Sequence, residues 1–500
     1  MSPHAFIVVV PVADRPRHLQ ACLASLAELL RRFPYPGPIR VLLADDSAAA
    51  ENIVANRAVA KRFSAHGLEV IHFPPEEQYA LVRSLSPALP RVLGDAPPER
   101  YGHKGQGVMR NIAYLKVAEM LRDAPAAEKT LIWSIDSDQE FRVDVAENDG
   151  YVIDFFNALD AIFGRSEVEV LTGKVVGDPP VSPAVMTRNF LDDVLAFLTQ
   201  MSACDPAAPC SHHAGSTAAG DAAYHDMAEL FGFSPAGHYA YPCPLDGAHT
   251  EADCFADFDR RVNSFFYGEH PTRSTAYAPG EPLASLQPAR TVYAGNYVFR
   301  PSALRYFIPF ANLRLRMSGP TLGRILKTEL GNRFVSANLP MLHRRTVETG
   351  GQAEFRPGIE TVAATVDMSG EFERQFYGDT MLFSVEKLAA GGSLCRPGAD
   401  FSAVLDDTRN EMLARYNARQ QAILARLTQL DALLDEPAHW WHGAAGGFRQ
   451  FAANVRRNFS AASSGHARIN APENWTLWRA RLLDALTHYE EDRAAWSRRI

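Results

Sequence analysis

Short apolar runs alternate with amphipathic stretches along the first third of the chain. Apolar residues fill positions 6–12 and 131–135, and mostly apolar runs occupy 39–44 and 68–73. The intervening stretches carry apolar residues at helical spacing, as from Leu19 to Leu29. Strands that alternate with helices in this way predict a largely parallel sheet with helices on both faces. We therefore expect residues 1–180 to form the first half of an α/β domain.

The pattern changes after residue 180. Residues 200–290 are rich in Ala, Pro, Gly, His and Cys and show weak periodicity, so we expect 181–290 to be an irregular insertion folded over the domain. A strand-like pattern returns at 291–300, and 291–400 is expected to complete the α/β domain. From Phe401 onward, apolar residues recur at helical spacing. This predicts a helical extension over 401–500, which would buttress the domain or form a homodimer surface.

Composition narrows the function classes. The chain has 500 residues, a formal net charge of −8 and 47% hydrophobic residues, which is typical of a globular protein of two or three domains. Without a dense basic stripe, nucleic acid is a poor partner. No apolar run approaches the roughly 18 residues that a transmembrane helix needs. The first strand begins at Phe6 without a preceding cationic signal, so we expect a cytoplasmic protein.

Two carboxylates follow the apolar run at 131–135. Asp136 and Asp138 stand two residues apart, so in an extended segment their side chains point the same way. Open α/β sheets place their ligands at the carboxyl ends of the strands. Two acids at a strand end are also typical of a turn and a helix cap. The tripeptide is therefore a candidate divalent-metal site that needs support from other residues.

That support comes from the order of four features. The first strand ends at Pro11, Asp45-Asp46 follow the second strand, Lys-Gly-Gln-Gly-Val-Met-Arg-Asn occupies 104–111, and Asp136-Ser137-Asp138 comes next. Together these residues resemble the GT-A glycosyltransferases of the family 2 type, over roughly residues 5 to 180 and in pieces from 291 to 346. The resemblance implies a GT-A fold and metal-dependent transfer of a sugar from a UDP- or GDP-linked donor to a hydroxyl acceptor.

The resemblance also implies roles for individual residues. Asp136 and Asp138 would bind Mn²⁺ or Mg²⁺, and Asp138 would be the direct ligand and central catalytic group. Asp46 would accept a hydrogen bond from the nucleobase, and Lys104 and Arg110 would bring positive charge to the diphosphate. The full expected donor side is Pro11, Asp14, Asp46, Lys104, Gly105, Arg110 and Asp136.

Further candidates lie in the second half of the chain. His343 resembles the downstream histidine that completes the metal shell in glucosyl-3-phosphoglycerate and mannosylglycerate synthases, and Arg345 would meet the diphosphate or an anionic acceptor. Gly295 and Asn296 resemble the small-residue acceptor strand, with Asn296 also a candidate catalytic residue. A bulge glycine followed by a turn-tolerant asparagine explains that pair equally well.

One segment departs from the family pattern. Inverting members place an acidic general base before the last metal ligand, whereas the matching segment 314–324 has no carboxylate. Two explanations are open. The reaction proceeds with retention, or the insertion delivers a base such as Asp253, Asp257 or Asp259.

The insertion also contains a group of soft metal ligands. Cys204, Cys210, His212, Cys243 and Cys254 suffice for a structural Zn²⁺ site, together with His213. The tight Cys-x2-Cys spacing of common zinc modules is missing, so unliganded cysteines in a loop are the competing explanation.

Two other functions share parts of this pattern. A nucleotidyltransferase would have the same sheet and metal acids, but it would follow its first strand with a glycine-rich loop instead of Pro-Val-Ala-Asp-Arg-Pro at 11–16. A non-catalytic sugar-nucleotide binder or scaffold would explain the missing base.

Overall fold

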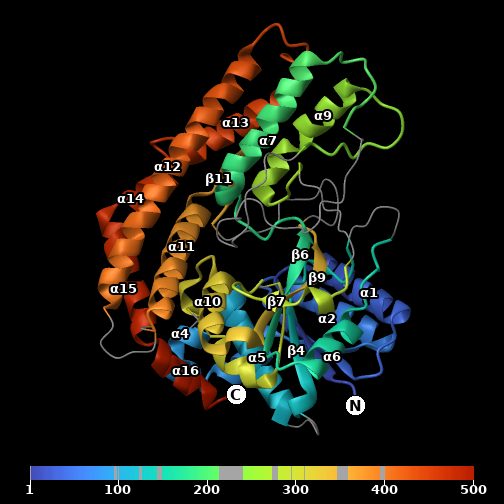
Figure 1. The fold of residues 1–500 in the computed structure, drawn as a ribbon, viewed down its shortest axis with the longest axis vertical. Helices are drawn as coiled ribbons and strands as arrows, with labels where there is room; N and C mark the ends of the chain where they lie inside the picture. The colour runs from blue at the N-terminus through green and yellow to red at the C-terminus, as the bar shows by residue number, and fades with distance from the viewer. Residues whose placement is uncertain are drawn as a thin grey trace.

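The chain folds into an α/β part and a helical part, which Figure 1 shows stacked along the long axis of the molecule. The structure is a computed structural model that describes residues 2–94, 98, 101–122, 127–143, 149–212, 240–272, 280–293, 295–308, 310–345, 358–392, 394 and 400–500.

A mixed sheet forms the centre of the α/β part. Within the described residues it has nine strands in the order β3-β2-β1-β4-β8-β6-β9-β5, with β7 paired to β9. Strands β5, β7 and β8 run opposite to the rest, so most of the sheet is parallel, as predicted. The strands are β1 Ala5–Val12, β2 Ile39–Asp45, β3 Glu69–Phe73, β4 Thr130–Ile135, β5 Gln139–Glu140, β6 Val170–Gly177, β7 Gln287–Pro288, β8 Asn296–Phe299 and β9 Phe334–His343.

The continuous apolar run of β1 is explained by burial on both faces of the sheet. Phe6, Val8 and Val10 point into one hydrophobic core, and Ile7 and Val9 point into the other. The first core is closed by α1, α2 and α6, and the second by α5 and α10 (Figure 1). The helices of this part are α1 Pro16–Arg32, α2 Ala50–Ala65, α3 Pro75–Val82, α4 Pro90–Leu93, α5 Gln106–Arg122, α6 Phe155–Arg165 and α10 Ser318–Leu330.

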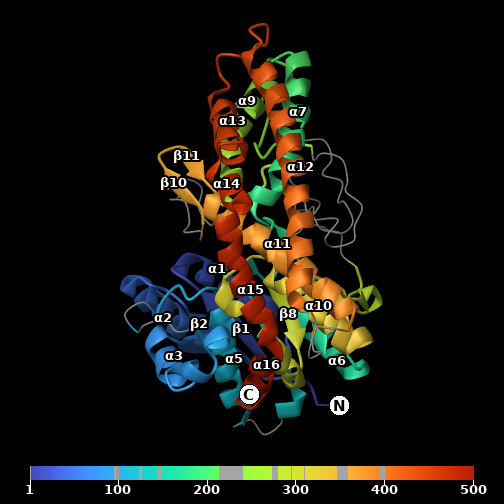
Figure 2. The ribbon, with the colours of Figure 1, turned by 90° about the vertical axis from the view of Figure 1, so that its left-hand side faces the viewer.

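The helical part combines the middle of the chain with its end. Figure 2 shows its long helices above the sheet, with α15 and α16 descending along the α/β part. The elements are α7 Pro183–Ala203, α9 Glu251–Arg261, α11 Ser369–Ala390, α12 Phe401–Asp435, α13 Gly446–Phe459, α14 Ser464–Asn470, α15 Pro472–Thr487 and α16 Tyr489–Ser497, with a hairpin of β10 Glu360–Val362 and β11 Thr365–Asp367.

The expectation of an irregular insertion over 181–290 is wrong for its helical segments. Helix α7 runs for 21 residues and packs against α12, and α9 packs against α13. The missed signal is the helical spacing of the buried Phe190, Val194, Phe197 and Met201. Helix α11, within the predicted 291–400 half, joins the two parts, because it packs against α10 of the α/β part and against α12 and α14 of the helical part.

The apolar residues of the C-terminal helices are buried within the single chain. Leu427, Leu430 and Leu434 on α12 are at most 3% exposed, inside a core shared with α7 and α13. The apolar residues that suggested a homodimer are therefore covered by other helices of the same chain, and they do not support dimerisation.

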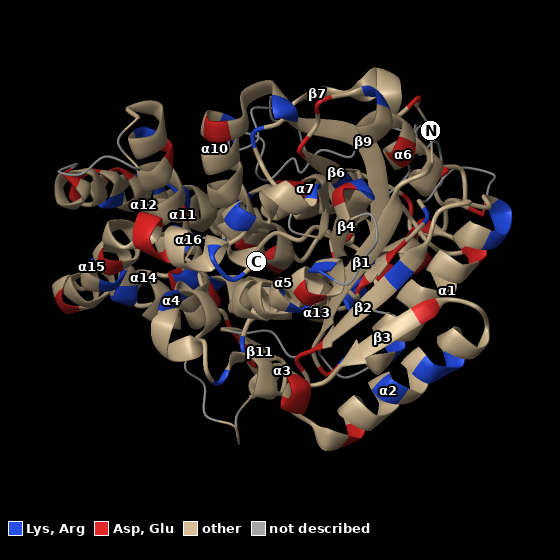
Figure 3. Ribbon diagram, turned by 90° about the horizontal axis from the view of Figure 1, so that it is seen from below, with Lys and Arg blue, Asp and Glu red and all other residues tan. Residues whose placement is uncertain are grey.

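The surface carries charge of both signs. Seen from below, basic and acidic segments are interspersed over the helices, for example along α2 (Figure 3). Among the described residues, no helix combines the length and the apolar character needed to cross a bilayer.

Candidate metal and donor site

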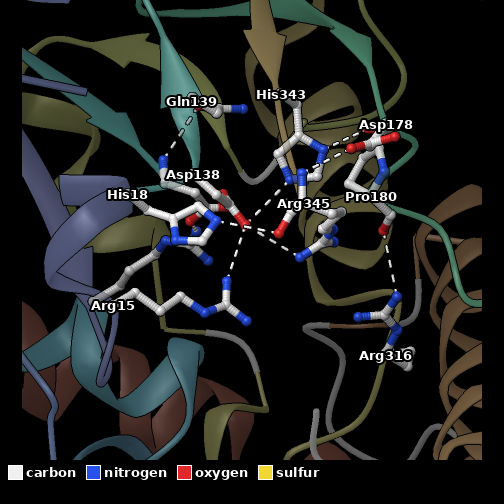
Figure 4. A network of polar contacts seen from close by, with 11 residues as sticks. Arg15, His18, Asp138, Gln139, Asp178, Pro180, Arg316, His343 and Arg345 are labelled. Atoms are coloured by element: carbon white, nitrogen blue, oxygen red, sulfur yellow. Dashed lines mark hydrogen bonds and ion pairs between the residues drawn. The ribbon is translucent and has the colours of Figure 1, made fainter. Parts of the chain in front are cut away.

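The predicted metal residues converge where the carboxyl ends of β4 and β9 meet. Asp136 and Asp138 lie in the turn between β4 and β5, and β5 pairs antiparallel with β9, so that Gln139 is opposite His343. The backbone N–H of Arg344 donates to the carbonyl oxygen of Asp138 at 2.9 Å. This pairing brings His343 to Asp138 across a long stretch of sequence (Figure 4).

Asp138 is buried at the centre of this group. Its Oδ2 lies 3.0 Å from Arg15 Nη1, 3.1 Å from Arg345 Nη1 and 3.3 Å from His343 Nε2. Burial by itself raises the pKa of Asp138, but its interactions with His343, Arg345 and Arg15 outweigh this effect and hold the pKa well below its usual range. The other oxygen, Oδ1, is buried and has no hydrogen-bond partner among the residues that the structure describes. A buried, ionised carboxylate with one unpaired oxygen is suited to a cation.

His343 presents a second ligand atom to the same place. Its Nδ1 contacts the carbonyl oxygen of Asp178, which only accepts, so Nδ1 carries the proton. In the neutral ring Nε2 therefore has a free lone pair, and it faces the Asp138 carboxylate. Two acceptors facing each other require a proton or a cation between them. The residues thus fit a divalent metal, and an imidazole with carboxylates favours Mn²⁺ over Mg²⁺.

Asp136 joins this group through Arg110. Arg110 Nη2 donates to Asp136 Oδ1 at 2.5 Å from the first turn of α5. Burial raises the pKa of Asp136, Arg110 opposes this rise, and neighbouring Asp138 adds to it. Gly295 passes close by, since a Cβ there would lie 3.1 Å from Asp136 Oδ2. A side chain at position 295 would therefore crowd Asp136 and Gln139.

Asp46 and Lys104, predicted separately, form an ion pair with each other. Lys104 Nζ lies 2.6 Å from Asp46 Oδ1, and the Lys104 N–H donates to the same oxygen at 3.1 Å. Burial raises the pKa of Asp46 and lowers that of Lys104, and the pairing opposes both shifts. Lys104 is 2% exposed and its ammonium lies over the Tyr101 ring, so it neutralises Asp46 and is not turned toward the metal acids. Its surroundings include a cavity of about 390 Å³ that Arg314 also lines.

The remaining donor-side residues shape the backbone near the site. Asp14 has a positive φ of 53°, and its carboxylate accepts hydrogen bonds from the N–H groups of Ala48 and Ala49 at the start of α2. Pro11 is buried in β1 opposite Ala44. Gly105 has φ +92° just before α5, a conformation that favours glycine. These positions hold the loops, and Asp14 in particular ties the loop after β1 to the loop that leads into α2.

The side chain of Asn296 forms its hydrogen bonds in the interior of the sheet. Its Oδ1 accepts from Trp133 Nε1 at 3.0 Å, and its Nδ2 donates to the carbonyl oxygens of Lys174 and Leu339, each at 2.8 Å. The amide fills the bulge at Gly173, where β6 shifts its register against β9. The predicted catalytic and acceptor-binding roles of Asn296 do not fit this arrangement, because both of its amide hydrogens are used inside the protein.

Three residues of the site were not predicted. Arg15 follows β1 and reaches Asp138, His18 on α1 contacts the carbonyl oxygen of Arg345, and Asp178 anchors both His343 and the Arg345 N–H, the latter at 2.7 Å (Figure 4). Arg15 was detectable in part, since it follows the apolar strand directly. His18 looked like an ordinary helix residue.

The acids proposed as a general base from the insertion all have structural partners. Asp253 forms a capping box with Thr250 at the start of α9. Asp257 accepts from Tyr241 Oη at 2.5 Å. Asp259 accepts from two backbone N–H groups at the start of α13, each at 2.9 Å. These contacts leave Asp253, Asp257 and Asp259 as parts of the helical framework.

Comparisons with known proteins give distant structural matches. No protein-family model matches the chain, and no curated protein matches it in sequence. Similar solved structures include glucosyl-3-phosphoglycerate synthase from Mycobacterium tuberculosis in complex with Mn²⁺ and UDP, at 12% identity and a TM-score of 0.28 over 68% of this chain and 72% of that one. Mannosyl-3-phosphoglycerate synthase from Rubrobacter xylanophilus matches at 13% identity and 0.33, over 80% and 79%. A mannosyltransferase from Pyrobaculum calidifontis in complex with GDP-mannose and Mn²⁺ matches at 10% identity and 0.34, over 98% and 87%. At such low scores, a function has to be argued from the residues of the site.

Proposed function

We propose that this protein is a metal-dependent glycosyltransferase that moves a sugar from a nucleoside-diphosphate sugar to a hydroxyl acceptor. The observation that carries the proposal is the convergence of the unpaired Asp138 Oδ1 and the His343 Nε2 lone pair beside Asp136. A divalent cation held there would act as a Lewis acid that neutralises the departing diphosphate.

The surrounding cations support an anionic diphosphate leaving group. Arg15 and Arg345 both reach Asp138 Oδ2, and their side chains are 21% and 14% exposed. Guanidinium groups bind phosphate oxygens through paired N–H donors. We assign these two residues to the diphosphate, with Arg110 held on Asp136. Arg15 and Arg345 thus take the role at the diphosphate that the sequence suggested for Lys104, because the Lys104 ammonium is paired with Asp46.

The donor's nucleobase is assigned to the end of β2. Asp46 follows this strand, and its backbone N–H donates to the carbonyl oxygen of Val12 at 2.6 Å, which fixes the carboxylate beside β1. A carboxylate there suits an N–H donor of a base ring. Both UDP- and GDP-linked sugars carry such a donor.

Retention of anomeric configuration is the stereochemical outcome that we infer. Helix α10 begins at Ser318 without an acid in its first turn, and the three acids of the helical part are engaged elsewhere. Without a positioned base, the leaving diphosphate itself can take the proton of the acceptor hydroxyl on the same face. The anomeric proton signal of the product in NMR distinguishes this outcome from inversion.

Calorimetry tests the donor site directly. The purified protein is titrated with UDP and with GDP, in Mn²⁺ and then in EDTA, and the titrations are repeated for Asp138→Asn. Asp149→Asn is the matched control, because the Asp149 side chain is half exposed and forms a surface ion pair with Arg32. We expect metal-dependent binding of one nucleotide that Asp138→Asn loses and Asp149→Asn keeps.

Turnover then separates the three function classes. A glycosyltransferase releases free nucleoside diphosphate from a sugar nucleotide, a nucleotidyltransferase releases pyrophosphate, and a non-catalytic binder releases neither. Absence of binding to both nucleotides in Mn²⁺ would refute the proposed function.

A further inference from the structure

A second group of metal-ligating side chains lies in the helical part, apart from the metal acids of the sheet. Cys210 follows α7, Cys243 and His249 precede α9, and Cys254 lies in the first turn of α9. One ligand atom from each of the four residues lies within 4.8 Å of all the others. We propose that these four side chains bind one structural Zn²⁺.

The distances favour a metal over other thiol chemistry. Cys254 Sγ lies 3.0 Å from Cys210 Sγ and 3.4 Å from Cys243 Sγ, and Cys243 Sγ lies 3.1 Å from His249 Nε2. A disulfide would need about 2.05 Å between sulfurs. Tetrahedral Zn²⁺ with bonds of about 2.3 Å places sulfurs roughly 3.8 Å apart. A small outward shift of the thiols therefore accommodates the ion.

A carbonyl group in the same loop fixes the tautomer of His249 that can bind a metal through Nε2. His249 Nδ1 lies 2.9 Å from the carbonyl oxygen of Gly247, and a carbonyl only accepts, so Nδ1 is the protonated nitrogen. The Nε2 lone pair is left to face Cys243. A backbone carbonyl that fixes the tautomer of a metal-binding histidine is a common feature of zinc sites.

The same geometry excludes two residues that the sequence suggested. Cys204 Sγ contacts the carbonyl oxygen and the sulfur of Met201, at 3.4 and 3.7 Å. His212 Nε2 lies 3.3 Å from a carboxylate oxygen of Glu251. His249, which the sequence analysis did not consider, takes the fourth place, and His213 lies outside the described residues.

Four protein ligands and no open position define a structural site rather than a catalytic one. The backbone already joins the two segments that contribute them, because Cys210 N–H donates to the His249 carbonyl oxygen at 3.0 Å and Pro209 bridges to Thr250. On binding, each thiol gives up one proton, and three thiolates, one neutral imidazole and Zn²⁺ leave one net negative charge.

The ion would fix the start of α9 against the end of α7. Tyr241, two residues before Cys243, stacks on Phe258 of α9 with ring centroids 4.6 Å apart and packs edge-on against Phe197 of α7. A tether at Cys210, Cys243 and Cys254 holds these rings together. Because the unfolded chain does not hold this four-ligand geometry, the free energy of zinc binding adds to the stability of the folded state.

The test is the metal content of the full-length protein purified without chelators and without a metal-binding tag. We expect about one zinc per chain by mass spectrometry of the metals. Cys243→Ser and His249→Gln replace partly exposed ligands and should reduce the content to near zero, whereas the control Cys204→Ser should keep it. Circular dichroism establishes that each variant is folded.

Cobalt substitution gives a measurement on the wild-type chain that does not depend on a variant. Removing the ion by chelation and adding Co²⁺ should produce the thiolate charge-transfer band and the strong visible bands of a tetrahedral site, with retained folding.

Three results would overturn the proposal. They are a folded wild-type chain that takes up neither zinc nor Co²⁺, zinc content unchanged in both ligand variants, and a mass lower by two hydrogens that reports a disulfide between Cys210 and Cys254. Since every readout is independent of nucleotide binding, the zinc site and the proposed function can fail separately.

Discussion

Replacing Asn296 by alanine removes three hydrogen bonds from the interior of the sheet. The partners left behind are the Trp133 indole N–H and the carbonyl oxygens of Lys174 and Leu339. Asn296 is 2% exposed, so water cannot replace its amide without opening the sheet. The perturbation thus separates a structural asparagine from the acceptor-binding one that the sequence suggested.

The expected loss of stability follows from these contacts. Each buried hydrogen bond contributes about 1 kcal/mol net, and an abandoned buried partner costs about 1 to 3 kcal/mol. We expect Asn296→Ala to lower the free energy of unfolding by about 3 to 4 kcal/mol, near the upper end for single substitutions. The exposed Asn157, which bonds Asp154 on the surface, provides the control, and Asn157→Ala should change stability by about 0.5 kcal/mol or less.

Urea unfolding followed by tryptophan fluorescence measures the difference, with the midpoint and the slope fitted separately. The second readout is the acceptor KM, measured without urea at a temperature at which both the wild type and Asn296→Ala are folded. A lower unfolding midpoint with an unchanged acceptor KM supports the structural role. An unchanged midpoint together with a raised acceptor KM would refute our reasoning and restore Asn296 to the acceptor site.

Three further predictions concern other parts of the molecule. Burial lowers the pKa of His466 from 6.5 to about 4, so the unfolded chain takes up the proton at a higher pH than the folded chain, and stability falls as the pH drops through that interval. Between pH 7 and pH 4.5, the free energy of unfolding of His466→Phe should therefore fall by about 2 kcal/mol less than that of the wild type. Urea titrations at both pH values measure this difference, and an equal fall in the two proteins would contradict the prediction. Gly295→Ala, whose Cβ would crowd Asp136 and Gln139, should weaken Mn²⁺-dependent nucleotide binding in calorimetry while changing the free energy of unfolding by about 1 kcal/mol or less. Leu427→Arg should prevent folding, because it places an unpaired charge in the interior of a single chain. If size-exclusion chromatography instead showed a dimeric wild type and a folded, monomeric variant, Leu427 would belong to a dimer surface.

Much of the sheet could be predicted from the sequence, because strands that are buried on both faces appear as continuous apolar runs. The apolar runs at 6–12 and 131–135 became β1 and β4, and the apolar residues at helical spacing from Leu19 to Leu29 lie on α1. The same reasoning placed Asp136 and Asp138 at a strand end. It failed for α7, because the surrounding Ala, Pro and Cys composition hid a periodic stretch that is buried on most sides.

Contacts between distant segments were decided by tertiary structure. His343 reaches Asp138 because β5 pairs with β9 in one register, and a shift by one residue would turn the imidazole to the other face. The pairing of Lys104 with Asp46 likewise depends on how the segment before α5 crosses the end of β2.

The proposed zinc ligands and Asn296 also show what the sequence indicates and what only the fold decides. Sequence alone identified the cysteines as soft ligands and Asn296 as a polar residue beside a glycine. Only the fold decided that His249 joins Cys210, Cys243 and Cys254, and that the Asn296 amide fills a bulge. The physical reason is that periodicity reports the environment of a residue on its own element, whereas its partners depend on strand register and crossovers, which are set by the packing of the whole chain.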